Sequence, residues 1–367
     1  MLIKKKINVL MISSSSSLGG GTKHMFTLGQ NLNNEFNTFY GIPKNCNFEN
    51  YLDSNFNIEI SERKLNFIDI LRLVNFIKSK SIDIIHAHGK GAGLISRLVI
   101  ILIRRPLIYT FHGIHLKCHN KLMRLLYIIY EFLLGGLDSI KILVSESEKD
   151  YALKSNIYLG DKYKVIHNGV DNMLKKNYEA KNNLTNKSLK AQRVKVLSVC
   201  RFVSQKNIKD TLKIAEKIRS LDFYIIGDGP LWKEIKNIIL KRKIKNVNLL
   251  GEKKDVYKYL YSADIFLSTS LYEGLPISIL EAMSVGLPII ASNVVGNRDT
   301  IENGKSGFLY NLENIETAVR YLKKLSKSKI LRQKLGNSAF NRQRSIFSRN
   351  SMVQQYMQIY RDQINRK

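Results

Sequence analysis

The stretch IFLSTSLYEGLPISILEAMSVGLPIIA, residues 265–291, decides the fold class of this chain. It opens with a short apolar run, Ile265–Ser268, and closes with a second one, Pro288–Ala291. Between the two runs, Pro276 is well placed as the first residue of a helix, because proline has no N–H to lose there. A strand, a helix and a second strand in this order are typical of a parallel sheet covered by helices.

The same alternation of apolar runs and amphipathic stretches continues outward from this stretch. We expect further strands at Ile7–Ile12, Thr38–Gly41, Asp83–His86, Leu107–Thr110, Ser139–Val144, Lys164–His167, Lys195–Val199, Phe223–Gly227 and Val247–Leu250, and helices such as Phe67–Ser79 and Leu122–Leu134. We therefore predict an α/β protein with two doubly wound, Rossmann-like domains that face each other across a cleft. In such sheets, ligands bind outside the carboxyl ends of the strands.

Chain length and one polar segment predict the domain boundaries. A chain of 367 residues is long enough for two cores. Residues 175–192, KKNYEAKNNLTNKSLKAQ, lack a hydrophobic period, which indicates a linker or an exposed excursion. We expect an N-terminal domain at 1–170, the linker at 171–193, a C-terminal domain at 194–345 and a last helix at 346–367 that returns toward the N-terminal domain.

The formal net charge of +29 restricts the partners without identifying one. Nucleic acid, anionic lipid and anionic substrates all favour such a charge, and a mutational bias toward Lys, Asn and Ile along the whole chain would also produce it. The three cysteines, Cys46, Cys118 and Cys200, are far apart and imply no disulfide framework. No apolar run approaches the roughly 18 residues of a membrane span, so we expect a cytoplasmic protein, with association at the inner face of the plasma membrane as an open alternative.

Two glutamates, Glu273 and Glu281, flank the predicted helix start in EGLPISILE. The free N–H groups and positive dipole end of such a helix can receive an anion. Glu281 lies about one and a half turns into the helix, so the two carboxylates can contact different parts of one extended ligand. The alternative is that both glutamates only stabilise the start of the helix.

Two cations, Arg201 and Lys206, follow the predicted strand Lys195–Val199 in RFVSQK. An arginine supplies a bidentate fork and a lysine a point charge, and together they suit a diphosphate. Two solvated surface cations are the alternative in so basic a chain.

Glycines and histidines at other predicted strand ends give weaker signals. Gly19, Gly20 and Gly21 allow a close approach of phosphate or sugar to the backbone, but they match neither the P-loop nor the G-x-G-x-x-G pattern. His112 follows the strand Leu107–Thr110, and we assign it a hydrogen bond to sugar or phosphate. A structural role is the expectation for His86. His112, His115, Cys118 and His119 crowd together but fit no common zinc spacing, so no metal site is assigned.

Taken together, these segments resemble the retaining glycosyltransferases of family 4, which have the GT-B fold. The matching segments run in family order over nearly the whole chain: the glycine loop Gly19–Gly21, HAHG (His86–Gly89), TFHG (Thr110–Gly113), VIHNGVD (Val165–Asp171), RFVSQKN (Arg201–Asn207), GDGP (Gly227–Pro230), EGLPISILEAM with GLPII (Glu273–Ile290) and NGKSGFL (Asn303–Leu309). No single segment is decisive, but the ordered set is highly specific.

The resemblance implies a role for each matching residue. Arg201 and Lys206 are implied to bind the donor diphosphate, and Glu281 the ribose. Glu273 and His112 are implied to lie beside the donor sugar as catalytic residues. The remaining donor-binding residues implied by the matching segments are Gly274, Leu275, Ile277, Gly20 and Gly21.

Three positions depart from the commonest family pattern. Cys200 stands where the family often has glycine before the arginine, and Asn207 where it often has glycine after the lysine. Asp299 occupies a place that glutamate often holds. These departures concern the details of donor choice and not the class.

The resemblance also implies the reaction and its partners. We expect retaining transfer of a hexose or N-acetylhexosamine from a nucleotide diphosphate, UDP before GDP, to a lipid-linked or glycan acceptor in surface polysaccharide synthesis. The chain lacks an Asp-x-Asp pair for a metal–diphosphate bridge, so we expect neither a metal nor a cofactor. The aromatic residues fall largely inside apolar segments rather than among the basic residues, so we expect no nucleic-acid partner. A nucleotide-sugar epimerase of the same fold, or a non-catalytic basic binding protein, are the alternatives.

One segment suggests an anionic membrane surface as a further partner. Residues 117–134, KCHNKLMRLLYIIYEFLL, place cations at one end of a dense apolar and tyrosine-rich run. Such a helix can rest on anionic lipid. The alternative is a helix packed between a sheet and its neighbours.

Overall fold

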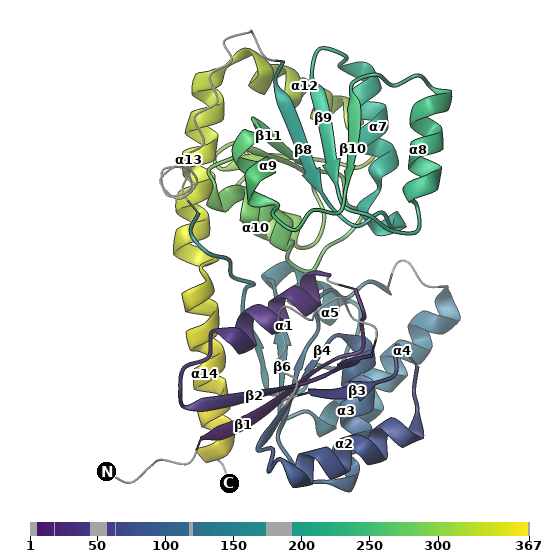
Figure 1. The fold of residues 1–367 in the computed structure, drawn as a ribbon, viewed down its shortest axis with the longest axis vertical. Helices are drawn as coiled ribbons and strands as arrows, with labels where there is room; N and C mark the ends of the chain where they lie inside the picture. Colours follow the sequence, from purple (N-terminus) through teal and green to yellow (C-terminus); the bar gives the residue numbers. More distant parts are fainter. Residues whose placement is uncertain are drawn as a thin grey trace. The chain divides into compact units, whose positions relative to one another are not determined.

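The computed structural model describes residues 6–17, 19–44, 57–62, 64–116, 120–173 and 193–365. The chain divides into two compact units, the first formed by Met1–Asn168 with Arg349–Lys367 and the second by Gly169–Ser348. Each unit contains one parallel sheet with helices on its faces (Figure 1). Most of the polar stretch expected as a linker, residues 174–192, lies outside the described residues, as do Cys46 and the zinc candidates Cys118 and His119.

The first unit is built on a seven-stranded sheet whose strands run in the order β3-β2-β1-β4-β5-β6-β7. All six pairs of neighbouring strands are parallel. The strands are β1 (Ile7–Ser13), β2 (Phe36–Pro43), β3 (Asn57–Ile60), β4 (Ile84–His88), β5 (Leu107–Thr110), β6 (Ile140–Leu143) and β7 (Tyr163–Val165). The helices are α1 (Gly20–Gln30), α2 (Phe67–Ser79), α3 (Lys90–Leu102), α4 (Lys121–Leu134), the 3-10 helix η4 (Gly135–Leu137), α5 (Glu146–Lys154) and α14 (Arg349–Asn365).

Alternate residues of β1 supply the two cores of the first unit. Leu10 and Ile12 point to the face covered by α2 and α3, and Val9 and Met11 to the face covered by α1 and α14. Successive side chains of a strand point to opposite faces, so a strand that is apolar throughout must be covered on both sides. Helix α14 therefore completes a core of the first unit although it follows the second unit in the chain.

The second unit contains a six-stranded parallel sheet in the order β10-β9-β8-β11-β12-β13. The strands are β8 (Lys195–Val199), β9 (Asp222–Ile226), β10 (Val247–Gly251), β11 (Ile265–Ser268), β12 (Ile289–Ser292) and β13 (Gly307–Tyr310). The helices are the 3-10 helix η5 (Ser204–Lys206), α7 (Ile208–Lys217), α8 (Trp232–Lys241), α9 (Tyr257–Ser262), α10 (Ile277–Ser284), α11 (Asn297–Thr300), α12 (Ile315–Lys327) and α13 (Lys329–Ile346).

The predicted fold class is confirmed, with local differences. Strands Leu107–Thr110, Lys195–Val199 and Ile265–Ser268 have the predicted bounds, whereas the sequence analysis missed β3 and β13. The predicted start of α10 was wrong by one residue. Pro276 has extended backbone, with ψ of 110°, and precedes the helix that begins at Ile277.

The strand orders fix where each sheet can bind a ligand. The chain reverses its direction of sheet growth between β1 and β4 in the first unit, and between β8 and β11 in the second. At such a switch point, the connections leave toward opposite faces and open a crevice at the carboxyl ends of the strands. Among the described residues, no helix is both long and apolar enough to cross a membrane.

Candidate functional site

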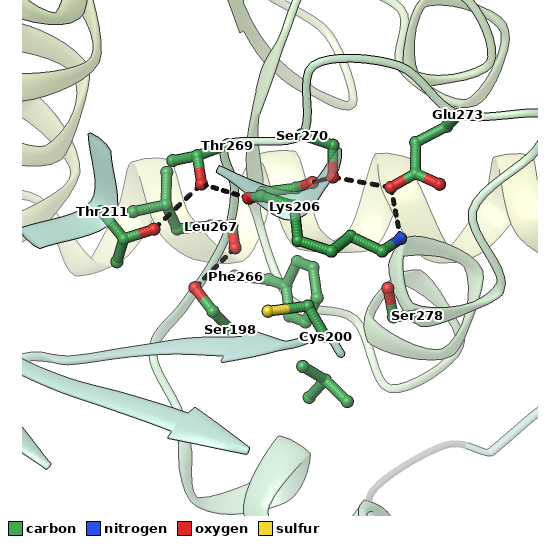
Figure 2. Close-up of a pocket in the computed structure, with 12 residues that line it drawn as sticks. Ser198, Cys200, Lys206, Thr211, Phe266, Leu267, Thr269, Ser270, Glu273 and Ser278 are labelled. Carbon is green, nitrogen blue, oxygen red and sulfur yellow. Dashed lines mark hydrogen bonds and ion pairs between the residues drawn. The ribbon is translucent and has the colours of Figure 1, made fainter. Parts of the chain in front are cut away.

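The switch point of the second unit carries a small polar pocket (Figure 2). It lies at the carboxyl ends of β8 and β11 and at the start of α10. Its lining residues are Ser198, Val199, Cys200, Lys206, Thr211, Phe266, Leu267, Ser268, Thr269, Ser270, Glu273 and Ser278. Two predicted site residues are therefore brought together here, Lys206 expected at the donor diphosphate and Glu273 expected beside the donor sugar.

Lys206 and Glu273 form an ion pair at this pocket. The Lys206 Nζ lies 2.6 Å from Oε1 of Glu273, and the Ser270 hydroxyl donates to the same oxygen at 2.6 Å. Gln205 Nε2 donates to the Tyr272 carbonyl at 2.8 Å, which fixes the loop that carries Glu273. Only 6% of Glu273 is exposed, so these partners hold the carboxylate in one orientation at low solvent access.

The loop that positions Lys206 depends on a left-handed residue. Asn207, between η5 and α7, has φ 47° and ψ 47°. Most residues with a Cβ avoid this region, but asparagine tolerates it better than others. The Asn207 Nδ2 also donates to Oδ2 of Asp210 at 2.6 Å. Asparagine can therefore replace the glycine that family 4 sequences often carry at this position.

Two glycines allow the backbones of neighbouring loops to approach the backbone of the pocket closely. A Cβ on Gly227 would lie 1.9 Å from the carbonyl oxygen of Cys200, and one on Gly296 would lie 2.4 Å from that of Gly274. Both have positive φ, 131° and 82° respectively. The GDGP loop and the loop after β12 thus support the backbone on either side of the pocket.

Cys200 replaces a common family glycine and lines the same pocket. Burial raises the pKa of its thiol to about 12. The thiol therefore stays protonated at physiological pH, and a thiolate nucleophile is not available here.

The other predicted donor-binding residues of this unit lie around the pocket rather than in its lining. Arg201 is half-buried directly after β8. Gly274 and Leu275 are buried in the turn before α10, and Ile277 is buried as the first residue of that helix. Glu281 is buried on α10. The pKa of Tyr257 on α9 is raised mainly because Tyr257 itself is buried, and in second place by the negative charge of Glu281.

The switch point of the first unit carries a cluster of histidines. His88 is the last residue of β4, His112 follows β5, and His24 lies on α1. The His88 Nδ1 lies 3.0 Å from Nε2 of His112, and ring nitrogens of all three residues lie within 4.8 Å of one another. In the sequence, His88 belongs to the matching segment HAHG but had no predicted role, and His24, which follows the glycine loop by one helical turn, was not predicted.

Gly21 explains how His112 reaches this cluster. A Cβ on Gly21 would lie 3.2 Å from the His112 ring, so the bare glycine lets the ring pack against α1. His112 itself has φ 60°, a left-handed conformation that aims its side chain away from the ordinary strand direction. A Cβ on Gly20 would meet nothing within 4 Å, so packing does not require that glycine.

His86 lies beside His88 of this cluster, and both of its ring nitrogens have hydrogen-bond partners. Its Nδ1 lies 2.7 Å from the Tyr360 hydroxyl on α14, and its Nε2 lies 2.8 Å from the Thr110 hydroxyl. The Thr110 hydroxyl in turn lies 3.2 Å from that of Tyr356. This is the structural role expected for His86, and it connects α14 to the strands that carry the cluster.

Comparisons with known proteins agree with this architecture. A family model described as Glycosyltransferase Family 4 matches residues 18–172, and one described as Glycosyl transferases group 1 matches residues 180–342. The UDP-Gal:alpha-D-GlcNAc-diphosphoundecaprenol alpha-1,3-galactosyltransferase of Escherichia coli is 30% identical over 279 residues, which cover 71% of each chain. The O-antigen biosynthesis glycosyltransferase WbnH of Escherichia coli is 26% identical over 316 residues, 86% of this chain and 88% of that one.

A solved structure shares the fold over nearly the whole length. Alr3699/HepE of Anabaena, in complex with UDP and glucose, gives a TM-score of 0.83 with 17% sequence identity, over 97% of this chain and 100% of that one. At this identity the likeness concerns the fold.

Proposed function

Because the chain belongs to the family 4 and group 1 glycosyltransferases, we propose that it transfers a sugar from UDP to a lipid-linked or glycan acceptor, with retention of configuration and without a metal ion. The family resemblance and the GT-B fold expected from the motifs are both confirmed. The observation that carries the proposal is the Lys206–Glu273 pair at the β8/β11 switch point. Surface polysaccharide synthesis is the proposed setting, since relatives are named for it.

Leaving-group departure concentrates negative charge on the nucleotide diphosphate, and the proposed site supplies positive charge for it. Arg201 and Lys206 are proposed to bind the diphosphate, as the matching motif residues do in the family. The N-terminus of α10 adds a dipole of the same sign. Positive groups held in place before the reaction stabilise the developing charge without a reorganisation cost. For this reason, we propose that neither a metal ion nor a cofactor is required.

The other predicted site residues are proposed to contact the ribose and the sugar of the donor. Glu281 is proposed to bind the ribose, and Glu273 and His112 to contact the transferred sugar. Lys206 and Ser270 hold the Glu273 carboxylate at 2.6 Å each, so it is already oriented when a sugar hydroxyl arrives. Attack on the same face as the leaving phosphate, which helps to take the acceptor proton, is the proposed route to retention.

The donor and the acceptor are proposed from relatives. The Escherichia coli relative is named for a UDP-galactose donor and a diphosphoundecaprenol acceptor, and Alr3699/HepE was solved with UDP. A UDP-hexose and an acceptor on a diphosphate lipid are therefore the pair to test first.

The proposal of a membrane-bound acceptor is supported by helix α4, which buries a charged residue and exposes its apolar residues. Its one buried residue is Glu131, whereas the apolar side chains around most of its circumference face solvent. Phe132 is 66% exposed and Leu133 is 68% exposed. The apolar surface of α4 consists of Leu122, Met123, Leu125, Leu126, Ile129, Phe132 and Leu133. Exposed apolar residues gathered on one element mark an interaction site.

A buried ion network holds α4 in this orientation. Glu131 accepts from Arg97 of α3 at 2.8 Å, and Arg97 also binds Asp138 through two hydrogen bonds, of 3.0 and 2.6 Å. The Arg97 guanidinium stacks over the ring of Tyr130 on α4, 5.0 Å from its centroid. A buried charge left without its partner is costly, so α4 cannot rotate to bury its apolar surface.

We assign this surface to anionic lipid. Lys121 and Arg124 are exposed at the first turns of α4, beside its apolar side chains. A helix with cations beside exposed apolar residues rests at the headgroup boundary of an anionic bilayer. Peripheral association of this kind would bring the enzyme to an acceptor whose lipid tail stays in the membrane.

The direct test is product analysis. Purified protein is incubated with UDP-hexoses and a diphosphate-lipid acceptor, and the products are followed by UDP release, mass spectrometry and NMR of the anomeric proton. We expect a glycosylated lipid with the donor's anomeric configuration. A free sugar of changed configuration would instead identify an epimerase, and the absence of any turnover would favour a non-catalytic binding protein.

A further inference from the structure

The histidine cluster of the first unit has more ring nitrogens than hydrogen-bond partners. Both nitrogens of His24 and the Nε2 of His88 are buried and have no partner among the described residues. The side chain of Asn168 lies beside His24. Buried polar groups of native proteins are nearly always paired, so three unpaired nitrogens in one cluster indicate a ligand.

The chemistry of the cluster suits a cation rather than an anion. All three side chains are imidazoles, two of them buried and one half-buried. A neutral imidazole has a lone pair on one ring nitrogen, and this is the form that binds a transition metal ion.

The geometry is close to that of a three-histidine site. Zinc–nitrogen bonds of about 2.0–2.1 Å place tetrahedral ligand atoms about 3.4 Å apart. The His88 Nδ1–His112 Nε2 hydrogen bond, at 3.0 Å, has nearly this separation, so a shared ion could replace its proton, and one ring nitrogen of each residue lies within 4.8 Å of the other two. Gly21 lets the His112 ring pack against α1, the helix that also carries His24.

We propose that His24, His88 and His112 form a binding site for a divalent transition metal ion of the zinc class. A donor set made only of imidazole nitrogens suits Zn²⁺, Co²⁺, Ni²⁺ or Cu²⁺, whereas Mg²⁺, Mn²⁺ and Ca²⁺ prefer oxygen ligands.

The site has a regulatory consequence that rests on the proposed function. If His112 contacts the donor sugar, a metal ion on its ring nitrogen removes that contact. Zn²⁺ then inhibits transfer, and a chelator restores it. Metal-free turnover and inhibition by zinc are therefore both expected of the same enzyme.

The test measures the metal directly on untagged, full-length protein that has been stripped with EDTA. Cobalt is titrated and its visible absorption bands report the ligand geometry, and zinc affinity is measured by competition with a chromophoric chelator. We expect one ion per chain in the wild type. His24→Ala removes one of the three proposed ligands and should weaken zinc binding more than about tenfold, because loss of even an outer-shell partner commonly costs about 10–100-fold.

The His24→Ala variant is accompanied by a matched control and a folding check. His115→Ala removes a histidine near the cluster in sequence but outside it, and it should keep wild-type zinc affinity. UDP affinity and the melting temperature show whether His24→Ala is folded. Equal zinc affinity of the wild type and a folded His24→Ala, or no tetrahedral cobalt spectrum, would overturn the site.

The two proposals fail separately. Loss of the cobalt signal with intact sugar transfer would remove only the metal site. Cobalt bound by the three histidines in a protein without transfer activity would remove the proposed function and leave the metal site standing.

Discussion

Lys206 and Glu273 pair directly at the carboxyl edge of the second sheet, with Nζ 2.6 Å from Oε1. They lie 67 residues apart in the chain and come from two different strand ends, those of β8 and β11. The pair joins the residue proposed for the diphosphate to the residue proposed for the sugar. Donor binding at this site would therefore act on both residues together.

Removal of either proposed diphosphate ligand should weaken nucleotide binding. We expect Arg201→Ala and Lys206→Ala each to cost about 1.5–3 kcal/mol of UDP affinity, the usual worth of a charged hydrogen bond. Isothermal titration calorimetry with UDP measures this. Lys213→Ala, an exposed lysine on α7 that pairs with Asp210, is the control and should bind UDP normally. Wild-type affinity in both test variants would contradict the diphosphate assignment.

The two glutamates should separate binding from turnover. Glu281→Ala should lose UDP affinity, because it is assigned to the ribose. Glu273→Gln keeps the size of the side chain and should lower kcat while UDP affinity stays nearly unchanged. Steady-state kinetics and UDP titration test the pair. If both variants simply lose their fold, the glutamates serve the start of α10 and not the donor.

Transfer should persist in excess EDTA, since Arg201, Lys206 and the N-terminus of α10 supply the positive charge. The rate of UDP release is measured before and after chelation. A rate that falls on chelation and returns with Mn²⁺ or Mg²⁺ would contradict the metal-independent mechanism. A rate that rises on chelation would agree with an inhibitory ion at the histidine cluster.

The left-handed conformation of Asn207 leads to a prediction about the stability of the protein. Asn207→Ala keeps a Cβ at φ 47° and loses the hydrogen bond to Asp210, so it should destabilise the protein by about 1–2 kcal/mol. Asn207→Gly loses the same hydrogen bond but relieves the backbone, and should be clearly more stable than the alanine variant. Urea unfolding measures both. Equal stability of the two variants would show that backbone strain is not the deciding factor.

The α4 surface should bind anionic vesicles. We expect the wild type to co-sediment with anionic but not with neutral liposomes, and Lys121→Glu with Arg124→Glu to stay in solution while keeping UDP affinity. The charge-matched control is Lys323→Glu with Lys327→Glu on α12, which should still sediment. A second variant, Leu122→Gln with Phe132→Gln, leaves the net charge unchanged and should also lose binding. Identical sedimentation of all four proteins would exclude α4 as the docking site.

The strands of this fold can be predicted from local sequence patterns, whereas the contacts between residues of the candidate site cannot. Runs such as Lys195–Val199 are apolar because both faces of a parallel sheet are covered, and this local pattern is visible without a structure. Strand β13, Gly307–Tyr310, was missed because it is short and begins with a glycine. The order of the motifs identified the family, but it did not reveal the Lys206–Glu273 pairing, which depends on the three-dimensional order of the strands.

Two features could not be predicted from local patterns. His24 joins His88 and His112 only because α1 returns over the β1/β4 switch point. Helix α4 is apolar around most of its circumference, so its periodicity cannot say which face is buried. That choice is made by Glu131, whose partner Arg97 lies 34 residues away.

The position of α14 has a consequence for biosynthesis. Residues 349–365 carry Met352, Tyr356 and Tyr360 into a core of the first unit, whose strands are translated first. Domains generally fold as units in the order in which they leave the ribosome, but this first domain cannot close its core until its last helix has emerged. Nascent chains would therefore hold an incomplete first domain, exposed to chaperones and proteases, while the whole second domain is synthesised.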